Sequence, residues 1–531
     1  IISSLVEKVK QNEPLAPGSA KLLKRALVIG GGVAGIHAAL DIANNGYEVT
    51  MVEKKPYIGG RMAQLSETFP TQESTRRLLS PKIAQVLRHP LIKLFTRAEV
   101  EAVSGSLGDF TARIKLKPAL VNRATCTGCK ACLEACPVTV DSKFNSGIST
   151  RKAIYIPLPL EILNKPVIDT RHCLHLKDKS CRACAEVCEA GAIDFEQSET
   201  IVEEKFGAMI ISTGYDLYPK EKFGEYGYGQ FKDVINGLEF ERLNALSGPT
   251  GGKLLRPSDG TVPQEIVFVQ CAGSRDPENH LPYCSKICCM YTAKQTLMFK
   301  RKIPEGQAYV FYMDNRAGGK GYEEFLQKAM EEGGAFYLRG RVSKVFKRNG
   351  KLVVWGVDTL TGKQIEIEAD MVVLATAIVP RADADALAKS LTVSTGEFGF
   401  QKEAHVKLRP VESTTRGIFF AGCSQGPKDI TDTISQAGCA ANKILGLFSA
   451  ETLQTDPVVA RLSVDICRGC GLCVAACPYD AREIDPQTNT AVVKEALCQG
   501  CGGCVSACSN KACELKNWTM EQIFHMIDIF E

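Results

Sequence analysis

The sequence predicts an α/β protein in which two doubly wound domains carry two small cysteine-rich domains. Two observations predict the α/β part: an apolar strand breaks into glycines at residues 25–35, and short apolar strands alternate with helical segments between residues 261 and 385. Two sets of eight cysteines, at residues 126–188 and 467–508, predict the small domains, one inserted and one C-terminal. The expected order is an N-terminal extension (1–24), the first α/β domain in three parts (25–117, 199–260 and 386–454), the inserted domain (118–198), the second α/β domain (261–385), the C-terminal cysteine domain (455–515) and a final helix (516–531).

Composition excludes several classes of protein. The 531 residues are 45% hydrophobic and 23% charged, as is usual for a globular protein, and the longest apolar run, Met371–Val379, is far shorter than the roughly 20 residues of a membrane helix. The 64 basic and 60 acidic residues leave a net charge of +4, which does not indicate a nucleic-acid partner. The first 25 residues are charged and contain Pro14 and Pro17, unlike a signal peptide, and a start at Ile1 suggests that residues precede it. We expect a cytoplasmic protein without a membrane span.

The first glycine-rich turn has the context of a dinucleotide-binding site. Gly30, Gly32 and Gly35 form G-x-G-x-x-G between an apolar strand and a helical segment at residues 36–43. The first glycine permits the tight turn, the second lets the backbone approach a pyrophosphate, and the third allows helix–strand packing. Glu53 ends the second strand, 47–53, where a carboxylate can bind ribose hydroxyls. The competing interpretation is a glycine turn without a ligand.

Later segments indicate which dinucleotide this domain binds. The expected binding residues beyond the first turn are Lys54, Gly60, Arg61, Gly214 after a strand at 210–214, and Gly422, Asp429 and Ile430 around a G-I-F-F-A-G-C strand and the helix 430–447. This order resembles the two-dinucleotide-domain flavoproteins of the thioredoxin reductase type, in which the first domain holds FAD. Cys423 stands where that family has an aspartate, and Asp429 at the helix start is a possible substitute.

The second α/β domain lacks the corresponding glycine turn. Its first strand, 265–269, is followed by Cys271, and the next helix is expected to begin with the cysteines at 284, 288 and 289. Further strands are expected at 307–313, 335–341, 352–357, 364–368 and 371–377. The replacement of glycines by cysteines suggests that electrons pass this domain through a metal cluster rather than as hydride. Buried thiols or a disulfide between the adjacent cysteines are the alternatives for Cys271, Cys284, Cys288 and Cys289.

The two eight-cysteine sets follow the C-x2-C-x2-C-x3-C-P pattern of two-cluster ferredoxins, in which the fourth cysteine serves the other cluster. Zinc is the competing metal. The pattern predicts four [4Fe-4S] sites: Cys126, Cys129, Cys132 and Cys188; Cys136, Cys173, Cys181 and Cys184; Cys467, Cys470, Cys473 and Cys508; and Cys477, Cys498, Cys501 and Cys504. Cys423, Cys439 and Cys513 have no spacing partners and are expected to be structural thiols.

Almost the whole chain from Arg25 onward resembles the A subunit of heterodisulfide reductase and its homologues. The segments that carry the resemblance are R-A-L-V-I-G-G-G-V-A-G-I (25–36), G-G-R-M-A-Q-L-S-E-T-F-P-T (59–71), R-K-A-I-Y-I-P (151–157), C-A-G-S-R-D (271–276), the cysteines 284–289 and A-G-C-S-Q-G-P-K-D-I (421–430). The resemblance implies FAD, a fifth [4Fe-4S] cluster on Cys271, Cys284, Cys288 and Cys289, and a catalytic lysine near the flavin, which would be Lys294. A solvated helix lysine is the alternative for Lys294. Five clusters would change the net charge from +4 to about −6 and require a reducing compartment.

The family implies a flavin-centred electron-transfer protein that performs electron bifurcation. The implied partners are reductase subunits of the B and C type, a hydrogenase- or dehydrogenase-linked donor and ferredoxin, in an oligomeric complex. Longer relatives carry a further N-terminal domain, and they have cysteines where this chain has Ser74 and Arg77, so we expect a short or divergent branch without the associated cluster. The alternatives are a relay component of a quinone-interacting or aromatic-CoA-reducing complex, an NAD(P)H-dependent oxidoreductase resembling the small subunit of glutamate synthase, and a scaffold that only carries clusters.

Overall fold

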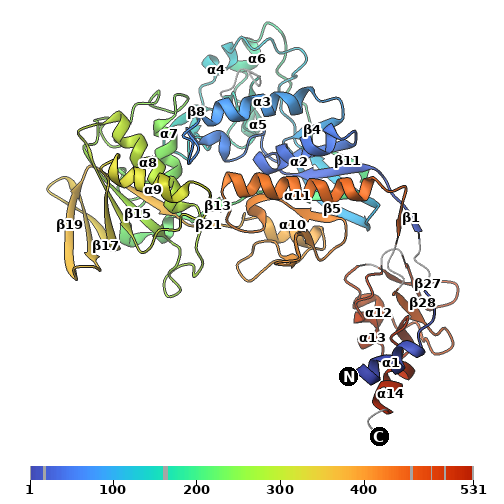
Figure 1. The fold of residues 1–531 in the computed structure, drawn as a ribbon. Coiled ribbons are helices and arrows are strands. Elements are labelled where there is room, and N and C mark those ends of the chain that lie inside the picture. The colour runs from blue at the N-terminus through green and yellow to red at the C-terminus, as the bar shows by residue number, and fades with distance from the viewer. Residues whose placement is uncertain are drawn as a thin grey trace.

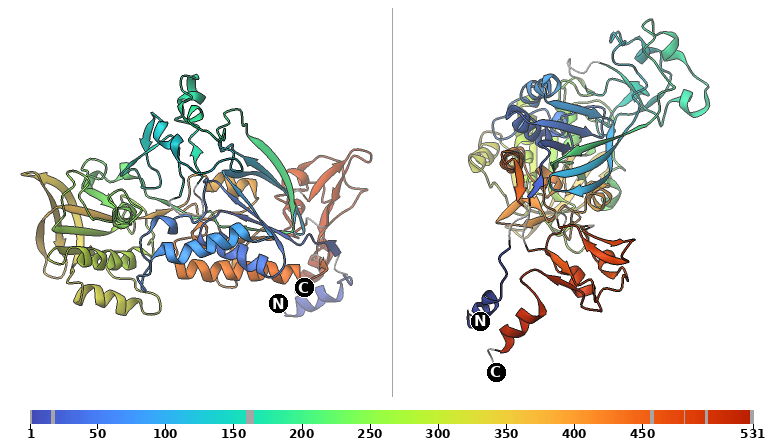
Figure 2. Two further views of the ribbon diagram at one scale, coloured as in Figure 1. Left: turned by 90° about the horizontal axis from the view of Figure 1, so that it is seen from above. Right: turned by 90° about the vertical axis from the view of Figure 1, so that its right-hand side faces the viewer.

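The computed structural model describes residues 2–15, 19–158, 165–454, 458–479, 481–495 and 498–528. Two α/β domains lie side by side, with the inserted and C-terminal cysteine domains attached at separate places on the first (Figures 1 and 2). Ile1, Pro17 and the expected boundary at residue 455 lie outside the described residues.

The first α/β domain is built on a seven-stranded sheet of order β22-β23-β24-β12-β2-β3-β4. Its centre is parallel, and β22 and β23 add an antiparallel edge. The central strands are almost completely buried, as parallel strands covered on both faces require. The strands are β22 (Glu403–His405), β23 (Arg409–Ser413), β24 (Ile418–Phe420), β12 (Ala208–Ile211), β2 (Arg25–Ile29), β3 (Glu48–Glu53) and β4 (Ile92–Thr96).

Two layers cover this sheet. On one face, α2 (Val33–Asn44) and α11 (Ile430–Phe448) pack against each other, and α3 (Thr75–Arg88) joins them. The small residues of the first two helices, such as Ala39 and Ala440, allow the close approach. On the other face lie α10 (Ala384–Ser390) and a three-stranded antiparallel sheet of β5 (Ala98–Ser106), β6 (Asp109–Leu116) and β11 (Thr200–Phe206).

The second α/β domain contains another seven-stranded sheet, of order β14-β20-β15-β16-β17-β18-β19. Helices α7 (Gly237–Asn244) and α8 (Cys288–Lys302) pack on it, and α9 (Tyr322–Glu331) packs against α8. The strands are β14 (Val234–Asn236), β20 (Met371–Thr376), β15 (Glu265–Ala272), β16 (Gln307–Tyr312), β17 (Phe336–Arg348), β18 (Lys351–Asp358) and β19 (Lys363–Ala369).

One expected boundary is wrong. The sequence predicts that residues 199–260 belong to the first domain, but β14 pairs in parallel with β20 and therefore belongs to the second sheet. The chain crosses between the domains on an antiparallel pair, β13 (Asp216–Leu217) with β21 (Ile378–Val379), so the second domain begins near residue 218. The physical reason is that β14 buries Val234 and Ile235 only against the second core.

The two cysteine domains have little regular structure besides short helices and hairpins. The inserted domain contains α4 (Ala131–Ala135), α5 (Leu174–Asp178), α6 (Ala183–Glu186), β7 (Thr139–Asp141), β8 (Thr150–Lys152), β9 (Ile154–Tyr155) and β10 (Val167–Ile168). The C-terminal domain contains α12 (Leu472–Ala475), α13 (Gly503–Ala507), β26 (Ala460–Leu462), β27 (Arg482–Asp485), β28 (Thr490–Val493) and β29 (Cys513–Leu515). Cysteines make up a large part of both cores.

The chain ends lie together beside the C-terminal domain (Figure 1). Helix α1 (Ile2–Lys10) packs against α14 (Met520–Ile527), and the Lys8 ammonium lies 4.0 Å from the centre of the Trp518 ring. Strand β1 (Ser19–Lys21) pairs antiparallel with β25 (Thr452–Gln454). Among the described residues, no helix is both long and apolar enough to cross a membrane.

Candidate functional site

The glycine turn after β2 is shaped by close backbone packing. Gly30 has φ +111°, and a Cβ there would lie 2.4 Å from Ser212 O. A Cβ on Gly35 would lie 1.9 Å from Gly30 O, so helix α2 can approach the turn only with glycine at this position. Gly32, the N-cap of α2, is different, because the nearest atom to its Cβ is Gly60 Cα at 4.0 Å. Packing within the protein therefore does not require glycine at residue 32. The glycine instead leaves open space that a ligand can occupy.

Glu53 is held at the mouth of this turn. Its Oε2 accepts a hydrogen bond from Gly31 N at 2.6 Å and its Oε1 accepts one from Lys55 N at 2.7 Å. The next residue, Lys54, turns away and forms an ion pair with Asp383, so its side chain does not line the cavity beside Glu53. Lys55 lines the cavity instead, and burial, assisted by the nearby Arg61 guanidinium, lowers the pKa of Lys55 to about 8.

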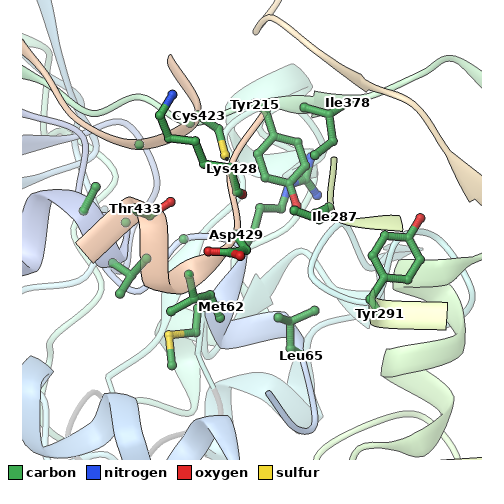
Figure 3. A pocket seen from close by; sticks show the side chains of 18 of the residues that line it. Met62, Leu65, Tyr215, Ile287, Tyr291, Ile378, Cys423, Lys428, Asp429 and Thr433 are labelled. Carbon is green, nitrogen blue, oxygen red and sulfur yellow. Dashed lines mark hydrogen bonds between the residues drawn. The ribbon is translucent and has the colours of Figure 1, made fainter. Parts of the chain in front are cut away.

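A cavity that opens to solvent lies between the two α/β domains, and the space within it, part of it open solvent, is about 1480 Å³. Figure 3 shows it between Tyr291 on α8 on one side and Cys423, Lys428 and Asp429 on the other. Nine of the expected site residues line it, eight predicted to bind the dinucleotide and Lys294 predicted as catalytic: Gly32, Glu53, Gly60, Arg61, Gly214, Lys294, Gly422, Asp429 and Ile430. Gly30 and Gly35 build the turn behind it. A space whose wall includes a glycine turn and a helix N-terminus suits a dinucleotide such as FAD.

Asp429 connects the two domains at this cavity. As N-cap of α11, its Oδ1 accepts a hydrogen bond from Asp432 N at 2.8 Å. Its Oδ2 accepts a hydrogen bond at 2.8 Å from the hydroxyl of Tyr322, which belongs to α9 of the second domain. Cys423 faces the same cavity, but its Sγ donates to Lys428 O at 3.3 Å, and burial raises the pKa of its thiol. The carboxylate near the helix start is therefore that of Asp429, while Cys423 remains a buried thiol.

Lys294 is a buried cation rather than a solvated helix residue. Its Nζ lies 2.8 Å from Glu241 Oε1, both side chains are 2% exposed, and Nζ also donates to Glu67 O at 2.7 Å. Burial alone would raise the pKa of Glu241, but Lys294 and three hydrogen bonds, two of them from Ser66, outweigh burial and hold that pKa below its usual value. The cavity thus has a fixed charged pair at the junction of α7 and α8.

Three of the four middle cysteines are in contact. The Sγ atoms of Cys271 and Cys289 both form hydrogen bonds with that of Cys288, and the bond from Cys288 lowers the pKa of Cys289 to about 7. Helix α8 begins at Cys288, so Cys284 lies in the loop before it, where its Sγ accepts from Lys286 N at 3.3 Å. Left-handed backbone conformations occur near these cysteines at Cys271 (φ 58°) and Lys286 (φ 62°).

The middle cysteines lie directly behind the wall of the cavity. Ile287 and Tyr291 line the cavity and flank Cys288 along α8, and Tyr291 also packs against the cysteines. Tyr291 follows Ile287 by four residues and Lys294 follows Tyr291 by three, so α8 and its N-cap present all three side chains on one face.

Each eight-cysteine set surrounds two small cavities with the expected partners. These cavities are lined by Cys126, Cys129, Cys132 and Cys188; by Cys136, Cys173, Cys181 and Cys184; by Cys477, Cys498, Cys501 and Cys504; and by Cys467, Cys470, Cys473 and Cys508. Backbone amides donate to several of the sulfurs, for example Ala192 N to Cys188 and Ala512 N to Cys508, both at 3.3 Å. Four converging thiols with amide donors fit a [4Fe-4S] cluster. Within the described ranges, no three His, Cys, Asp or Glu side chains are arranged to hold a single metal ion.

Cys513 lies beside one of these groups, although its spacing indicates no partner. It lines the cavity of Cys467, Cys470, Cys473 and Cys508, and its thiol forms hydrogen bonds with Cys473 and Cys508. Strand β29 carries Cys513 back onto the preceding loop, a contact that linear spacing does not show. Sequence reasoning also does not single out Tyr291, Tyr322, Glu241 and Lys55, although helical spacing on α8 could have identified Tyr291.

Comparison with protein families agrees with this architecture. Residues 26–140 match the FAD dependent oxidoreductase family, and residues 125–192 and 460–509 each match a 4Fe-4S dicluster domain. Among solved structures, the thioredoxin reductase of T. acidophilum covers 80% of this chain and 99% of its own length, with a TM-score of 0.45 and 14% sequence identity. The predicted fold class is confirmed: an α/β flavoprotein with ferredoxin-like domains.

Named relatives match almost the whole chain. The iron-sulfur A subunit 2 of the CoB–CoM heterodisulfide reductase of Methanopyrus kandleri is 45% identical over 91% of this chain and 73% of its own length. The A subunit of the H2:CoB-CoM heterodisulfide,ferredoxin reductase of Methanothermobacter marburgensis is 43% identical over the same shares. The A subunit of the H2/formate:CoB-CoM heterodisulfide,ferredoxin reductase of Methanococcus maripaludis is 41% identical over 99% of this chain and 80% of its own length. The protein is an oxidoreductase component with an FAD-dependent domain and iron–sulfur domains, and the chain belongs to the family of heterodisulfide reductase A subunits.

Proposed function

We propose that this protein transfers electrons between a two-electron donor and one-electron acceptors, and that it bifurcates them. The observation that carries the proposal is the position of the middle cysteines. Cys288 and Cys289 begin α8 and pack against Tyr291, which lines the cavity between the α/β domains together with Ile287. A redox group on these cysteines would be the nearest acceptor for a flavin in that cavity, and bound FAD would supply the exchange between two-electron and one-electron steps.

The proposed FAD site uses the residues that line the cavity from the first domain. The α2 N-terminus at Gly32 would receive the pyrophosphate, and the Glu53 carboxylate would bind ribose hydroxyls. Arg61 is positioned by an ion pair with Asp216 at 3.3 Å and by its contact with the Tyr215 ring, 5.6 Å from the ring centre. Near the other end, Lys294 is held by Glu241 and would place a positive charge in the wall.

The proposed cluster content is five [4Fe-4S] clusters. Four would be held by the cavities of the two dicluster domains, and the fifth by Cys271, Cys284, Cys288 and Cys289. Cys284 would contribute its thiolate from the loop before α8.

The partners follow from the names of the relatives. The Methanothermobacter protein is named for H2, the CoB–CoM heterodisulfide and ferredoxin. We propose that this chain likewise works with reductase subunits, a hydrogenase- or dehydrogenase-linked donor and ferredoxin. A disulfide takes up two electrons, so two electron pairs from the donor would reduce one disulfide and deliver one electron to each of two ferredoxin clusters.

Cofactor analysis of the purified chain tests the site. We expect about one acid-released FAD and about 20 iron atoms per chain. Gly32→Val should abolish flavin binding, because its side chain would occupy the ligand space and, at 4.0 Å from Gly60 Cα, meets no protein atom closely. Cys271→Ala and Cys289→Ala should each remove about four irons. The release of FMN, or full iron with an unchanged paramagnetic spectrum in both cysteine variants, would contradict these assignments.

Two kinetic experiments test the electron route. NADH should not rapidly bleach the flavin absorbance of the isolated chain, because the turn after Val269 carries Cys271 in place of a glycine fingerprint. In a complex reconstituted with its partner subunits, ferredoxin should be reduced only while the disulfide acceptor is also present. Reduction of ferredoxin at the same rate without that acceptor would show a relay without bifurcation.

A further inference from the structure

Arg482 is a buried cation between the two cysteine groups of the C-terminal domain. It is 4% exposed, and its Nη2 donates to Cys504 Sγ at 3.3 Å. Arg482 and Cys504 line one cavity, and Cys473, which lines the second cavity, and Cys513 are also close enough to act on Arg482 electrostatically. Its Nη1 has no hydrogen-bond partner, and in the part of the chain that the structure describes no carboxylate lies within ion-pair distance of the guanidinium.

This environment requires a negative group. A buried guanidinium that lacks a carboxylate partner is costly, because desolvation is not compensated. The groups that surround Arg482 are thiols, which become anionic as thiolates when they bind iron. Arg482 is therefore placed to be compensated by the negative charge of loaded clusters.

The inserted domain provides an internal comparison. Strands β7 and β27 start at corresponding places: Val138 O accepts from Ala153 N, and Ala481 O accepts from Lys494 N. The position of Arg482 then corresponds to Thr139, which is exposed. Apart from burial, the groups with the largest effect on the pKa of the Cys132 and Cys184 thiols are other cysteines. Among the described residues of the inserted domain no lysine or arginine is buried, so the buried arginine distinguishes the C-terminal domain from it.

We propose that Arg482 raises the reduction potential of the clusters bound by the C-terminal cysteines above that of the clusters in the inserted domain. The inference rests on the proposed function, because it requires clusters in both domains. Uptake of one electron changes a [4Fe-4S] cluster with its four thiolates from about −2 to about −3, and a fixed cation stabilises the more negative state more strongly.

A potentiometric titration of the full chain, followed by electron paramagnetic resonance, tests the role of Arg482. In Arg482→Gln, one part of the reduction curve should move to more negative potential. At the potential that half-reduces these clusters in the unchanged chain, their ratio of reduced to oxidised form should fall about tenfold. Arg461→Gln is the matched control, because it removes the same charge in the same domain from a side chain that is 40% exposed and paired with Glu514 at 3.1 Å. Its titration should match that of the unchanged chain.

Iron and flavin contents are measured first, so that two failures can be distinguished. A chain without clusters would refute the proposed function itself. A fully loaded Arg482→Gln variant with an unshifted curve would refute only the role of Arg482. If Arg482→Gln fails to load iron, Arg482→Lys decides: full loading with the retained charge supports the electrostatic role, and failure of both variants shows that the arginine serves packing and overturns the proposal.

Discussion

Removal of the Lys294 ammonium is expected to leave the buried carboxylate of Glu241 without its counter-ion. The two groups are 2.8 Å apart and their side chains are 2% exposed. Breaking such a pair by removing one partner costs about 3–5 kcal/mol. Lys294→Met keeps most of the buried aliphatic stem, so this cost should appear as a loss of about 3–5 kcal/mol in the free energy of opening of α8 at pH 8.

The loss should depend on pH in a defined direction. In the unchanged chain the pKa of Glu241 lies below 4.5 despite burial, so the group contributes stability above its unfolded pKa and loses it as the pH falls through the folded value. In Lys294→Met the ammonium no longer opposes burial, and the pKa of Glu241 rises. The carboxyl then takes up a proton as the pH falls from 8 to 5, and the cost of the substitution should shrink over that range.

Hydrogen exchange of the α8 amides, corrected for intrinsic exchange rates, measures this free energy at both pH values. Combining Lys294→Met with Glu241→Gln should recover most of the loss, because no unpaired charge remains buried. Lys328→Met is the control: its pair with Glu332 is 3.6 Å long between side chains 47% and 70% exposed, and its cost should stay within about 0.5 kcal/mol. A cost below about 1 kcal/mol for Lys294→Met, or an equal cost at pH 5 and pH 8, would refute the reasoning.

Three further predictions concern other parts of the chain. Gly35→Ala should destabilise the first domain by about 1–3 kcal/mol and lower its flavin content, because a Cβ would lie 1.9 Å from a backbone oxygen, whereas Gly446→Ala in α11 meets no atom within 4 Å and should be neutral or stabilising in thermal melts. Phe144→Ala should remove the contact with the Arg242 guanidinium, which lies 4.7 Å from the ring centre, and should therefore increase the rate of limited proteolysis of the inserted domain. An unchanged cleavage rate would show that this contact does not anchor the domain. Burial raises the pKa of Glu239 to about 7, so it contributes stability at low pH that is lost as the pH rises from about 4.5 to 7; Glu239→Gln should flatten that part of the stability profile measured by denaturant titration, and an unchanged slope would contradict it.

Much of the fold could be predicted because buried parallel strands are continuous apolar runs. The strands expected at 307–313, 352–357 and 371–377 are found as β16, β18 and β20 within one or two residues. Strand β14 could not be predicted in the same way. It has three residues, follows a loop rich in glycine and tyrosine, and acquires its place only by pairing with β20, more than 130 residues later.

In the candidate site, too, some residues could be predicted from the sequence and others could not. Glu53 ends β3, and the residues after it bend rather than continue the strand. Lys55 lines the cavity and Lys54 pairs with Asp383, so a position next to Glu53 in the sequence does not identify which lysine faces the cavity. Tyr322 and Glu241 could not be predicted, because they reach the cavity from elements whose position depends on the packing of the two domains.

The paired chain ends determine how the C-terminal domain can move. It is attached at two points rather than one, since β1 leads to α1 and β25 leads to the rest of the domain, while α1 and α14 hold the far ends together. A domain attached by one linker can rotate about that linker. A domain attached by two linkers that are joined at both ends can bend toward or away from its neighbour, but its rotation about either linker is restricted. Any movement of the C-terminal cysteines would therefore be restricted to bending, so they would keep the same orientation toward the first α/β domain each time the domain returned.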